Sequence, residues 1–525
     1  MHERSRISII WMQNRRRRRL PPGFSMSAML ILVLLFSSAA PSWAAALPLE
    51  GFDSYVQKSL QTWQVPGAAI SVVQDGEVVF RQGFGVRELG KAAPVDTNTI
   101  FAIGSASKAF TATALAMLVD QGKIGWDSPV TEVLPGFRLA DPWVNRHISL
   151  RDMLSHRTGF KGADILWIWQ EGFLSRDQIV SRLQYEKMAF PFRSQWHYNN
   201  LMYLAAGQVI PALTGMSWDA YIQAKILQPL GMKDSNTSVK QLVGQSDVAC
   251  PHLRQDGKVV PIKYRNVDMI AAAGAINSNI IDMTEWLEFQ LADCTWQGKA
   301  LLKPATVLQM RAPQISMPIP YPCPSLPGAH FLGYGLAWFL QDYHGLKVVH
   351  HGGNIDGMTA LVALVPEKKF GVVILSNLDT TKLRDVLLYN LLDRLTGRKP
   401  QDWNPHFLAL DEKSKQAVQE GIDQKIKARH LHTKPTFPLT AYCGEYHHDF
   451  YGKITIRTVQ NSLFYKYQGR EVRLSHWHYN SFRRPNWSTE EPGIELVTFN
   501  LDSDGVIDSM SDDSMARFIK VKAVR

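Results

Sequence analysis

Cysteine is scarce in this sequence of 525 residues, which contains only Cys250, Cys294, Cys323 and Cys443. Four widely spaced cysteines are too few for a disulfide framework, and if all were paired, three connectivities would be possible. None has the close spacing of a structural metal site. The scarcity excludes a small disulfide-stabilised fold, and at this length the chain has room for two domains with an ample hydrophobic core.

Long hydrophobic runs are also lacking. The apolar run at residues 28–40 is shorter than the roughly 20 residues that cross a bilayer. It follows a run of arginines at 15–19 and precedes small residues around Ala44, an order typical of a secretory signal peptide over residues 1–44. We expect cleavage after Ala44, export to the periplasm or the medium, and no transmembrane segment in the mature chain. The alternatives are a start at Met26 and an uncleaved N-terminal anchor.

A large charge surplus is absent once this segment is set aside. The formal net charge is +10, but seven arginines and one glutamate fall within residues 1–44, so their removal takes away +6 and leaves +4. This balance does not indicate a nucleic-acid partner. A hydrophobic content of 45% and a charged content of 20% are ordinary for a globular protein.

Helical and strand patterns alternate over residues 45–398. Helices are expected at 49–63, 109–119 and 383–395, and strands at 68–73, 77–82, 336–341, 347–350, 359–365 and 371–375. Strands at both ends of a mostly helical middle indicate an α+β fold, with one antiparallel sheet assembled from distant segments and helices packed on it.

The last quarter of the chain has a different pattern. Residues 399–437 are polar and charged, with a solvated helix expected at 411–429, and are interpreted as a linker. Residues 438–525 form a predicted small β domain, a sandwich or barrel. Its expected strands are 453–459, 462–467, 471–474, 495–500 and 505–510.

A serine three residues before a lysine stands at the start of the predicted helix at 109–119. Positions three apart lie on one helix face, so Ser105 and Lys108 can meet there. A serine is a poor nucleophile until a base takes its proton, and a desolvated lysine has a lowered pKa and can be that base. On its own the pattern is weak, because a helix cap with a solvated lysine explains it equally well.

Two later motifs stand where this pair would need them. Tyr198 and Asn200 form a Tyr-x-Asn in the helical middle, and His351-Gly352-Gly353-Asn354 ends the strand predicted at 347–350. Together with Ser-x-x-Lys, these motifs resemble the penicillin-recognising serine hydrolases, which include class C β-lactamases, D,D- and D-amino peptidases and related esterases. The resemblance covers about 49–396. It implies a β-lactamase/transpeptidase-like fold, in which helices flank the sheet beside an all-helical subdomain.

The resemblance also implies roles for these residues. Ser105 would become acylated, while Lys108 and Tyr198 share proton handling, the lysine charge bringing the tyrosine pKa down. Asn200 would hydrogen-bond the acyl portion of the substrate. The strand residues His351, Gly352 and Gly353 would border the substrate, and backbone N–H groups of Ser105 and Asn354 would form the oxyanion hole.

The third motif has histidine where β-lactamases and D,D-peptidases usually carry a lysine that binds a substrate carboxylate. His351 is largely neutral at about pH 7 unless perturbed. This difference favours an esterase, or a peptidase acting on D-residues, whose substrate is a small molecule or a peptide. A true β-lactamase or D,D-peptidase and a non-catalytic binding protein remain alternatives.

The sequence implies no metal and no cofactor. It has no Gly-x-Ser-x-Gly elbow, no His-Glu-x-x-His and no Walker loop. The histidines at 446–448 and 476–478 suggest a metal site only weakly, and surface or domain-contact roles are favoured.

Overall fold

The computed structural model describes residues 47–168, 174–486 and 493–521. The predicted signal peptide over 1–44 and its cleavage after Ala44 lie outside these residues. Across the described ranges no helix combines the length and apolarity needed to cross a membrane. All four cysteines have free thiols.

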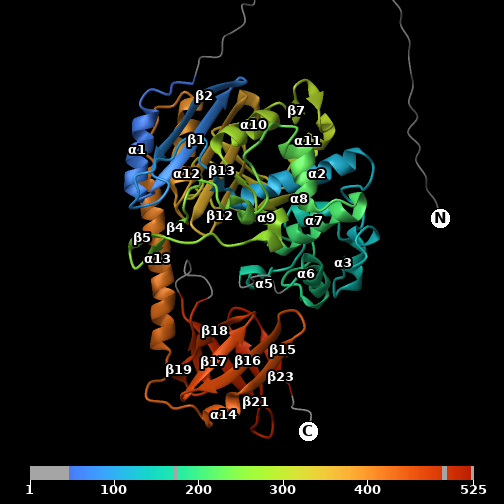
Figure 1. The fold of residues 1–525 in the computed structure, drawn as a ribbon, viewed down its shortest axis with the longest axis vertical. Coiled ribbons are helices and arrows are strands. Elements are labelled where there is room, and N and C mark those ends of the chain that lie inside the picture. Colours follow the sequence, from blue (N-terminus) through green and yellow to red (C-terminus); the bar gives the residue numbers. More distant parts are fainter. Residues whose placement is uncertain (1–46, 169–173, 487–492, 522–525) are drawn as a thin grey trace, which may run out of the picture. The chain divides into compact units, whose positions relative to one another are not determined.

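An eight-stranded antiparallel sheet organises the N-terminal two thirds of the chain (Figure 1). Its strand order is β2-β1-β14-β13-β12-β11-β10-β9, so strands from both ends of this region lie side by side. The strands are β1 Gly67–Gln74, β2 Glu77–Gly85, β9 Ile315–Met317, β10 Leu332–Tyr334, β11 Phe339–Tyr343, β12 Leu346–Ile355, β13 Met358–Val365 and β14 Phe370–Ser376.

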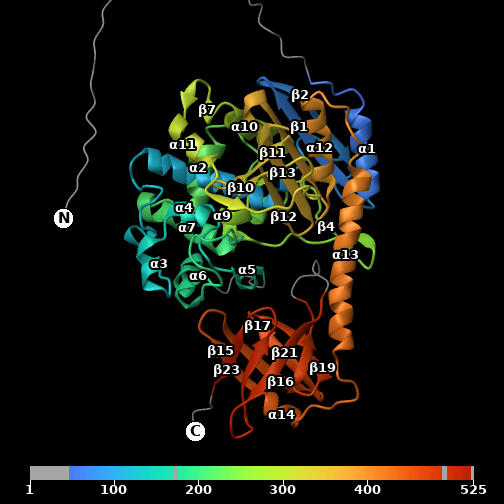
Figure 2. The same ribbon diagram turned by 180° about the vertical axis from the view of Figure 1, so that it is seen from behind.

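The centre of the sheet is covered on both faces. Every residue of β1, β13 and β14 is buried, as expected for strands rich in Val, Ile and Ala that lie between two layers. Helix α10 (Ile280–Leu291) packs on one face. Helices α1 (Phe52–Trp63) and α12 (Leu383–Leu395) cover the other face, as the two opposite views show (Figures 1 and 2).

A helical region follows β2 and surrounds α2 (Ser107–Asp120). Alanine and large apolar residues occupy all sides of α2, so the helix is buried almost throughout. The Phe110 ring stacks on Trp286 of α10 with 3.7 Å between centroids. The other helices here are α3 Pro142–His147, α4 Leu150–Leu154, α5 Ile165–Ile168, α6 Arg176–Arg182, α7 Asn200–Thr214, α8 Trp218–Ile222, α9 Ala271–Gly274 and α11 Pro304–Met310.

Three two-stranded ladders accompany these helices. They pair β3 (Phe101–Ala102) with β6 (Asn277–Ser278), β4 (His252–Gln255) with β5 (Lys258–Pro261), and β7 (Thr295–Trp296) with β8 (Lys299–Ala300).

The C-terminal part is a nine-stranded antiparallel sheet that nearly closes into a barrel, with strand order β18-β17-β16-β15-β23-β22-β21-β20-β19. Helices α13 (Asn404–Lys427) and α14 (Leu439–Tyr442) precede it. The strands are β15 Gly444–His448, β16 Gly452–Val459, β17 Ser462–Tyr467, β18 Arg470–Arg473, β19 Ser475–His478, β20 Ser481–Arg484, β21 Glu495–Leu501, β22 Ile507–Asp512 and β23 Arg517–Lys520.

The predicted fold class is confirmed for both parts: a helix-flanked antiparallel sheet with a helical region, and a C-terminal all-β barrel. Some element bounds differ from the prediction. Helix α13 begins at Asn404 rather than at 411, because the Asn404 side chain hydrogen-bonds Trp63 and Ser59 of α1. The strand expected to end at 350 continues to Ile355, because its glycines stay in register with β13.

The histidine clusters noted in the sequence lie on two strands of the barrel, His447 and His448 in β15 and His476 and His478 in β19. Among the residues described, no group of three or more His, Cys, Asp or Glu side chains is arranged to hold a metal ion. In β19 a register shift interrupts the pairing between His476 and His478, and buried Trp477 lies under the guanidinium of Arg429.

Candidate active site

Ser105 lies in a 3₁₀ turn, Gly104–Ala106, immediately before α2. The sequence placed it on the helix with Lys108, but the two side chains still meet, because Lys108 Nζ lies 3.0 Å from Ser105 Oγ. Gly104 has φ +50°, and a Cβ on it would lie 3.1 Å from the carbonyl oxygen of Asn354. A Cβ on Gly353 would overlap the carbonyl of Ile103. The two glycines therefore let the β12 backbone lie directly against the turn that carries the serine.

The Lys108 side chain is fully buried beneath this turn. Its ammonium contacts three oxygens: Ser105 Oγ, Asn200 Oδ1 at 2.8 Å and the Ala273 carbonyl at 2.9 Å. Burial lowers the pKa of Lys108 to about 7, against an opposing effect of the Asp164 carboxylate. The neutral amine keeps two donors for Asn200 and Ala273 and directs its lone pair at the Ser105 hydroxyl, which is the arrangement of a base and its nucleophile.

Tyr198 lies over the same pair. Its ring centroid is 4.7 Å from Lys108 Nζ and 4.4 Å from the ring of His156. The expectation that Lys108 lowers the pKa of Tyr198 is wrong. Burial raises the pKa of Tyr198 above its ordinary value, while a hydrogen bond to Ser105 partly opposes this. The phenol is therefore protonated at neutral pH, and Lys108 is the better base of the two.

Asn200 begins α7 and connects the lysine to an acidic side chain that the sequence analysis missed. Its Oδ1 accepts from Lys108, and its Nδ2 donates to the Asp164 carboxylate at 3.2 and 3.3 Å. The residue that caps α7 is Asn199, whose side chain accepts from the Met202 amide. Asp164 also accepts from the Trp167 indole at 2.8 Å. No motif marks Asp164, because its position depends on how the loop before α5 meets α7.

His351 lies in the interior of β12 and only 2% of it is exposed. Its Nδ1 donates to the Gly352 carbonyl at 2.6 Å, so its Nε2 accepts from the Tyr334 hydroxyl at 2.9 Å. Burial, with the nearby Lys108 charge, lowers the pKa of His351 well below its ordinary value. The residue in the place of the motif lysine is therefore a neutral, hydrogen-bonded ring.

A cleft of about 580 Å³ opens above the serine. It is called the catalytic cleft below, and the predicted residues that line it are Ser105, Tyr198, Asn200, His351, Gly352 and Asn354. Lys108 and Gly353 lie behind this surface. A larger hollow of about 930 Å³ beside α1 and β2 is lined by no serine, histidine or carboxylate among the described residues, so size alone does not locate the site.

Four charged side chains line the walls of the catalytic cleft: Asp164, Asp379, Arg384 and Asp385. Arg384 of α12 donates to the Gly353 carbonyl, to Asn354 Oδ1 and to the Ala360 carbonyl at 3.1–3.3 Å. Its Nε lies 3.9 Å from Asp385. Sequence reasoning missed these residues as well, since nothing in their spacing relates them to the three motifs.

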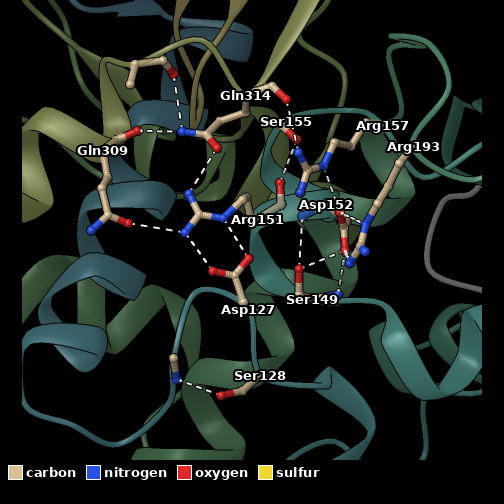
Figure 3. Close-up of polar contacts among 12 residues, drawn as sticks. Asp127, Ser128, Ser149, Arg151, Asp152, Ser155, Arg157, Arg193, Gln309 and Gln314 are labelled. Carbon is tan, nitrogen blue, oxygen red and sulfur yellow. Dashed lines mark hydrogen bonds and ion pairs between the residues drawn. The ribbon is translucent and has the colours of Figure 1, made fainter. Parts of the chain in front are cut away.

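A buried carboxylate holds the segment before Tyr198 in place (Figure 3). Asp152 is inaccessible to solvent and accepts from Ser149, Arg157 and Arg193 at 2.7–2.8 Å. The Arg193 amide donates to the Arg157 carbonyl, so both guanidinium groups and the backbone join these two loops. Burial acts against ionisation, but hydrogen bonds from Arg193, Ser149 and Arg157 hold the Asp152 pKa below its ordinary value.

The adjoining contacts in Figure 3 join α4 to three neighbouring segments. Arg151 of α4 pairs with Asp127 and donates to Gln309 and Gln314.

The residues on both sides of Tyr198 are hydrogen-bonded to His156. The His197 amide donates to the His156 carbonyl, and the Asn199 amide donates to His156 Nδ1 at 3.1 Å. Tyr198 is therefore held from both neighbouring residues.

Known protein families match both parts of the chain. The Beta-lactamase family matches residues 52–396, and a domain of unknown function, DUF3471, matches residues 428–522. Unguisins hydrolase ungD' of Aspergillus campestris is 30% identical over 425 residues, which cover 78% of this chain and 77% of that protein. Penicillin-binding protein 4 of Amycolatopsis lactamdurans is 28% identical over 348 residues, 65% of this chain and 89% of that protein.

Solved structures share the fold. The octameric penicillin-binding protein homologue from Pyrococcus abyssi superposes with a TM-score of 0.61 at 21% identity, covering 90% of this chain and all of that one. The structure of SurE with D-Leu gives a TM-score of 0.54 at 19% identity and covers 90% of this chain and 99% of that one.

Proposed function

The chain belongs to the Beta-lactamase family of serine hydrolases, and on this premise we propose that it cleaves ester or amide bonds through an acyl-enzyme on Ser105. The observation that carries the proposal is the buried Lys108 amine, 3.0 Å from Ser105 Oγ and with a pKa of about 7. A serine beside a base that is substantially neutral at working pH is an activated nucleophile.

Acylation follows from the geometry of the site. Neutral Lys108 takes the proton as Ser105 Oγ attacks the substrate carbonyl. The backbone N–H groups of Ser105 and Asn354 bind the resulting oxyanion, each worth roughly 3 kcal/mol. The Tyr198 phenol donates its proton to the leaving group and recovers one from the Lys108 ammonium. In deacylation the same groups act in reverse on a water molecule, which restores the free serine.

Substrate preference follows from the third motif. His351 is buried and neutral, so it offers no fixed charge to a substrate carboxylate. Esters, or amides of D-residues, are therefore the favoured substrates over β-lactams, which carry that carboxylate. Turnover of penicillin by the chain is expected to be weak or absent.

A β-lactamase or D,D-peptidase is the second candidate. Arg384 lines the catalytic cleft and contacts Asn354, so a cation is present although the motif lysine is not. The relative named penicillin-binding protein 4 also favours this candidate. Hydrolysis of penicillin at a rate comparable with that of simple esters would establish it.

The test is labelling of the wild type and of Ser105→Ala with a fluorophosphonate, together with hydrolysis of p-nitrophenyl butyrate. We expect labelling and hydrolysis to disappear in Ser105→Ala. Ser107→Ala is the matched control, because Ser107 lies two positions away but accepts from the Ile276 amide instead of facing the cleft. Equal labelling of Ser105→Ala and the wild type would overturn the mechanism. A wild type that is neither labelled nor active would favour a non-catalytic binding protein.

Export is part of the proposal and is supported by the basic, apolar and small-residue order over residues 1–44. N-terminal sequencing of the protein recovered from the periplasm or the medium is the test. We expect the mature chain to begin at Ala45, and recovery of the intact chain from the membrane would support the uncleaved anchor.

A further inference from the structure

The wall of the catalytic cleft carries an exposed carboxylate, Asp164, that forms no ion pair with a cationic side chain in the part of the chain that the structure describes. Asp164 is solvent-exposed and lines the cleft together with Ser105 and Tyr198. Over residues 47–168, 174–486 and 493–521 no Lys, Arg or His side chain forms an ion pair with it. Its hydrogen-bond donors are neutral, the Asn200 amide and the Trp167 indole. These bonds fix the carboxylate in position and leave its charge unpaired.

The position of Asp164 relative to the reacting atoms is set by a chain of hydrogen bonds. Ser105 contacts Lys108, Lys108 contacts Asn200, and Asn200 contacts Asp164. Because Asn200 is expected to bind the acyl portion of the substrate and Asp164 contacts Asn200, we assign Asp164 to the acyl side of the cleft. Its charge reaches the reaction centre, since it raises the pKa values of both Lys108 and Tyr198.

The other charged groups of the cleft do not offset this carboxylate. Asp379 and Asp385 are acidic as well, and the guanidinium of Arg384, which also lines the cleft, lies within 3.9 Å of Asp385. The cleft walls therefore carry more negative than positive charge. Such a surface attracts cationic substrates and disfavours anionic ones.

We propose that Asp164 is a recognition site for a protonated amino group on the acyl part of the substrate, which makes aminoacyl esters or amides with a free amine the preferred substrate class. The inference rests on the proposed function, because it assigns a subsite to the same acyl-enzyme chemistry. In the bound substrate the ammonium donates to an Asp164 oxygen that Trp167 leaves open, while the scissile carbonyl faces Ser105.

The test compares benzyl thioesters of D- and L-alanine, each with a free or an N-acetylated amino group, at about pH 7, where the free α-amine is largely protonated. The quantity measured is the ratio of kcat/KM for the free amine to that for its acetylated partner. Asp164→Asn keeps an oxygen for Trp167 and Asn200 but removes the charge. Because both substrates use the same Lys108, any change in the lysine pKa cancels in the ratio.

We expect the wild type to prefer the free amine of at least one enantiomer by about 10- to 100-fold, the value of a charge-assisted hydrogen bond, and Asp164→Asn to lose that preference. As a second measurement, 1-aminoethylboronic acid should inhibit the wild type more strongly than ethylboronic acid does, and the difference should disappear in the variant.

Asp385→Asn is the matched control, since it removes the same charge from the same cleft at a site that faces Arg384. An equal loss of preference in Asp385→Asn would assign the effect to the general field and overturn the subsite. An unchanged ratio in Asp164→Asn, a wild-type preference for the acetylated substrate, or hydrolysis of p-nitrophenyl butyrate without hydrolysis of any thioester would also overturn it. Failure of the proposed function is a separate result, namely Ser105→Ala remaining active on p-nitrophenyl butyrate.

Discussion

Replacing Lys108 with methionine separates the catalytic use of the buried amine from its effect on stability. The pKa of Lys108 falls from 10.5 to about 7 on burial. At about 1.4 kcal/mol per unit, the buried charge costs roughly 5 kcal/mol relative to the neutral amine. At about pH 7 half of the lysine is then neutral, against about one molecule in 3,000 for an ordinary lysine.

The expected kinetic result is a kcat/KM for p-nitrophenyl butyrate that rises with pH and is half-maximal at about pH 7, because only the neutral amine accepts the Ser105 proton. Lys108→Met removes the base while keeping an unbranched side chain, and should lower kcat/KM by about 10²- to 10⁴-fold. The inflection at about pH 7 should disappear from whatever activity remains. A wild-type inflection near that of an ordinary lysine, or an unchanged inflection in the variant, would refute the assignment.

Although Lys108→Met lowers activity, it should not lower the stability of the protein at about pH 6. Between about pH 7 and pH 10 the unfolded chain holds a proton on Lys108 that the folded protein has released, so the free energy of unfolding of the wild type rises with pH in this window. The rise from this group between about pH 7 and pH 9 is about 2 kcal/mol, and Lys108→Met lacks it. At about pH 6 the variant should be at least as stable as the wild type. It loses donors to Asn200 and to the Ala273 carbonyl, at about 1 kcal/mol each, but it no longer buries a charge. Urea denaturation at several pH values measures both effects, and parallel stability curves for the two proteins would contradict the buried-amine argument.

Four further changes test other parts of the site and the fold. Tyr198→Phe should lower kcat for p-nitrophenyl butyrate by about 10²-fold or more with an unchanged circular-dichroism spectrum, because it removes the proton donor but keeps the ring; full activity would exclude the phenol from proton transfer. Gly353→Ala should abolish fluorophosphonate labelling and lower the melting temperature, since its Cβ overlaps the backbone of the nucleophile turn, and normal labelling would show that the turn can move away. Asp152→Asn should be less stable than the wild type by about 3 kcal/mol above about pH 5, with the difference shrinking as the pH falls through the depressed pKa of Asp152, because protonation removes the same charge from the wild type; a pH-independent difference would contradict this. Arg484→Met should lower the unfolding free energy by about 3–5 kcal/mol, because it leaves the buried Asp512 carboxylate without its guanidinium partner, and unchanged urea denaturation would contradict this.

The predicted site residues that could be placed relative to one another from the sequence are those whose spacing is local. Ser105 and Lys108 are three residues apart, and Tyr198 lies just before the helix that Asn200 begins, so each pair could be placed from its motif. The long strands β1, β2, β13 and β14 could be predicted as well, because runs of Val and Ile between clear turns are distinctive. The strand pattern anticipated one antiparallel sheet assembled from distant segments, but it did not predict the particular pairing of β1 with β14.

The parts that could not be predicted depend on contacts between loops. Asp164 and Arg384 enter the catalytic cleft because the loop before α5 meets the start of α7, and because α12 packs against β13 within reach of Gly353. No periodicity in the sequence records either contact. The raised pKa of Tyr198 was missed for a related reason. Proximity to a lysine suggests a lowered value, but the sequence does not show how deeply the ring is buried or that the lysine itself is largely neutral.

The close backbone contact at Gly104 and Gly353 limits the positions at which substitutions can change the substrate range of this protein. The turn that carries Ser105 (Gly104–Ala106) contacts β12 through main-chain atoms. Few side-chain substitutions can therefore be accepted there without moving the serine. The cleft walls at 161–168 and 379–385 carry their charges on side chains that can be exchanged individually. A combinatorial library limited to those two segments should therefore yield variants with new substrate ranges that still react with fluorophosphonate, whereas a library at 103–105 and 352–354 should yield mostly inert protein.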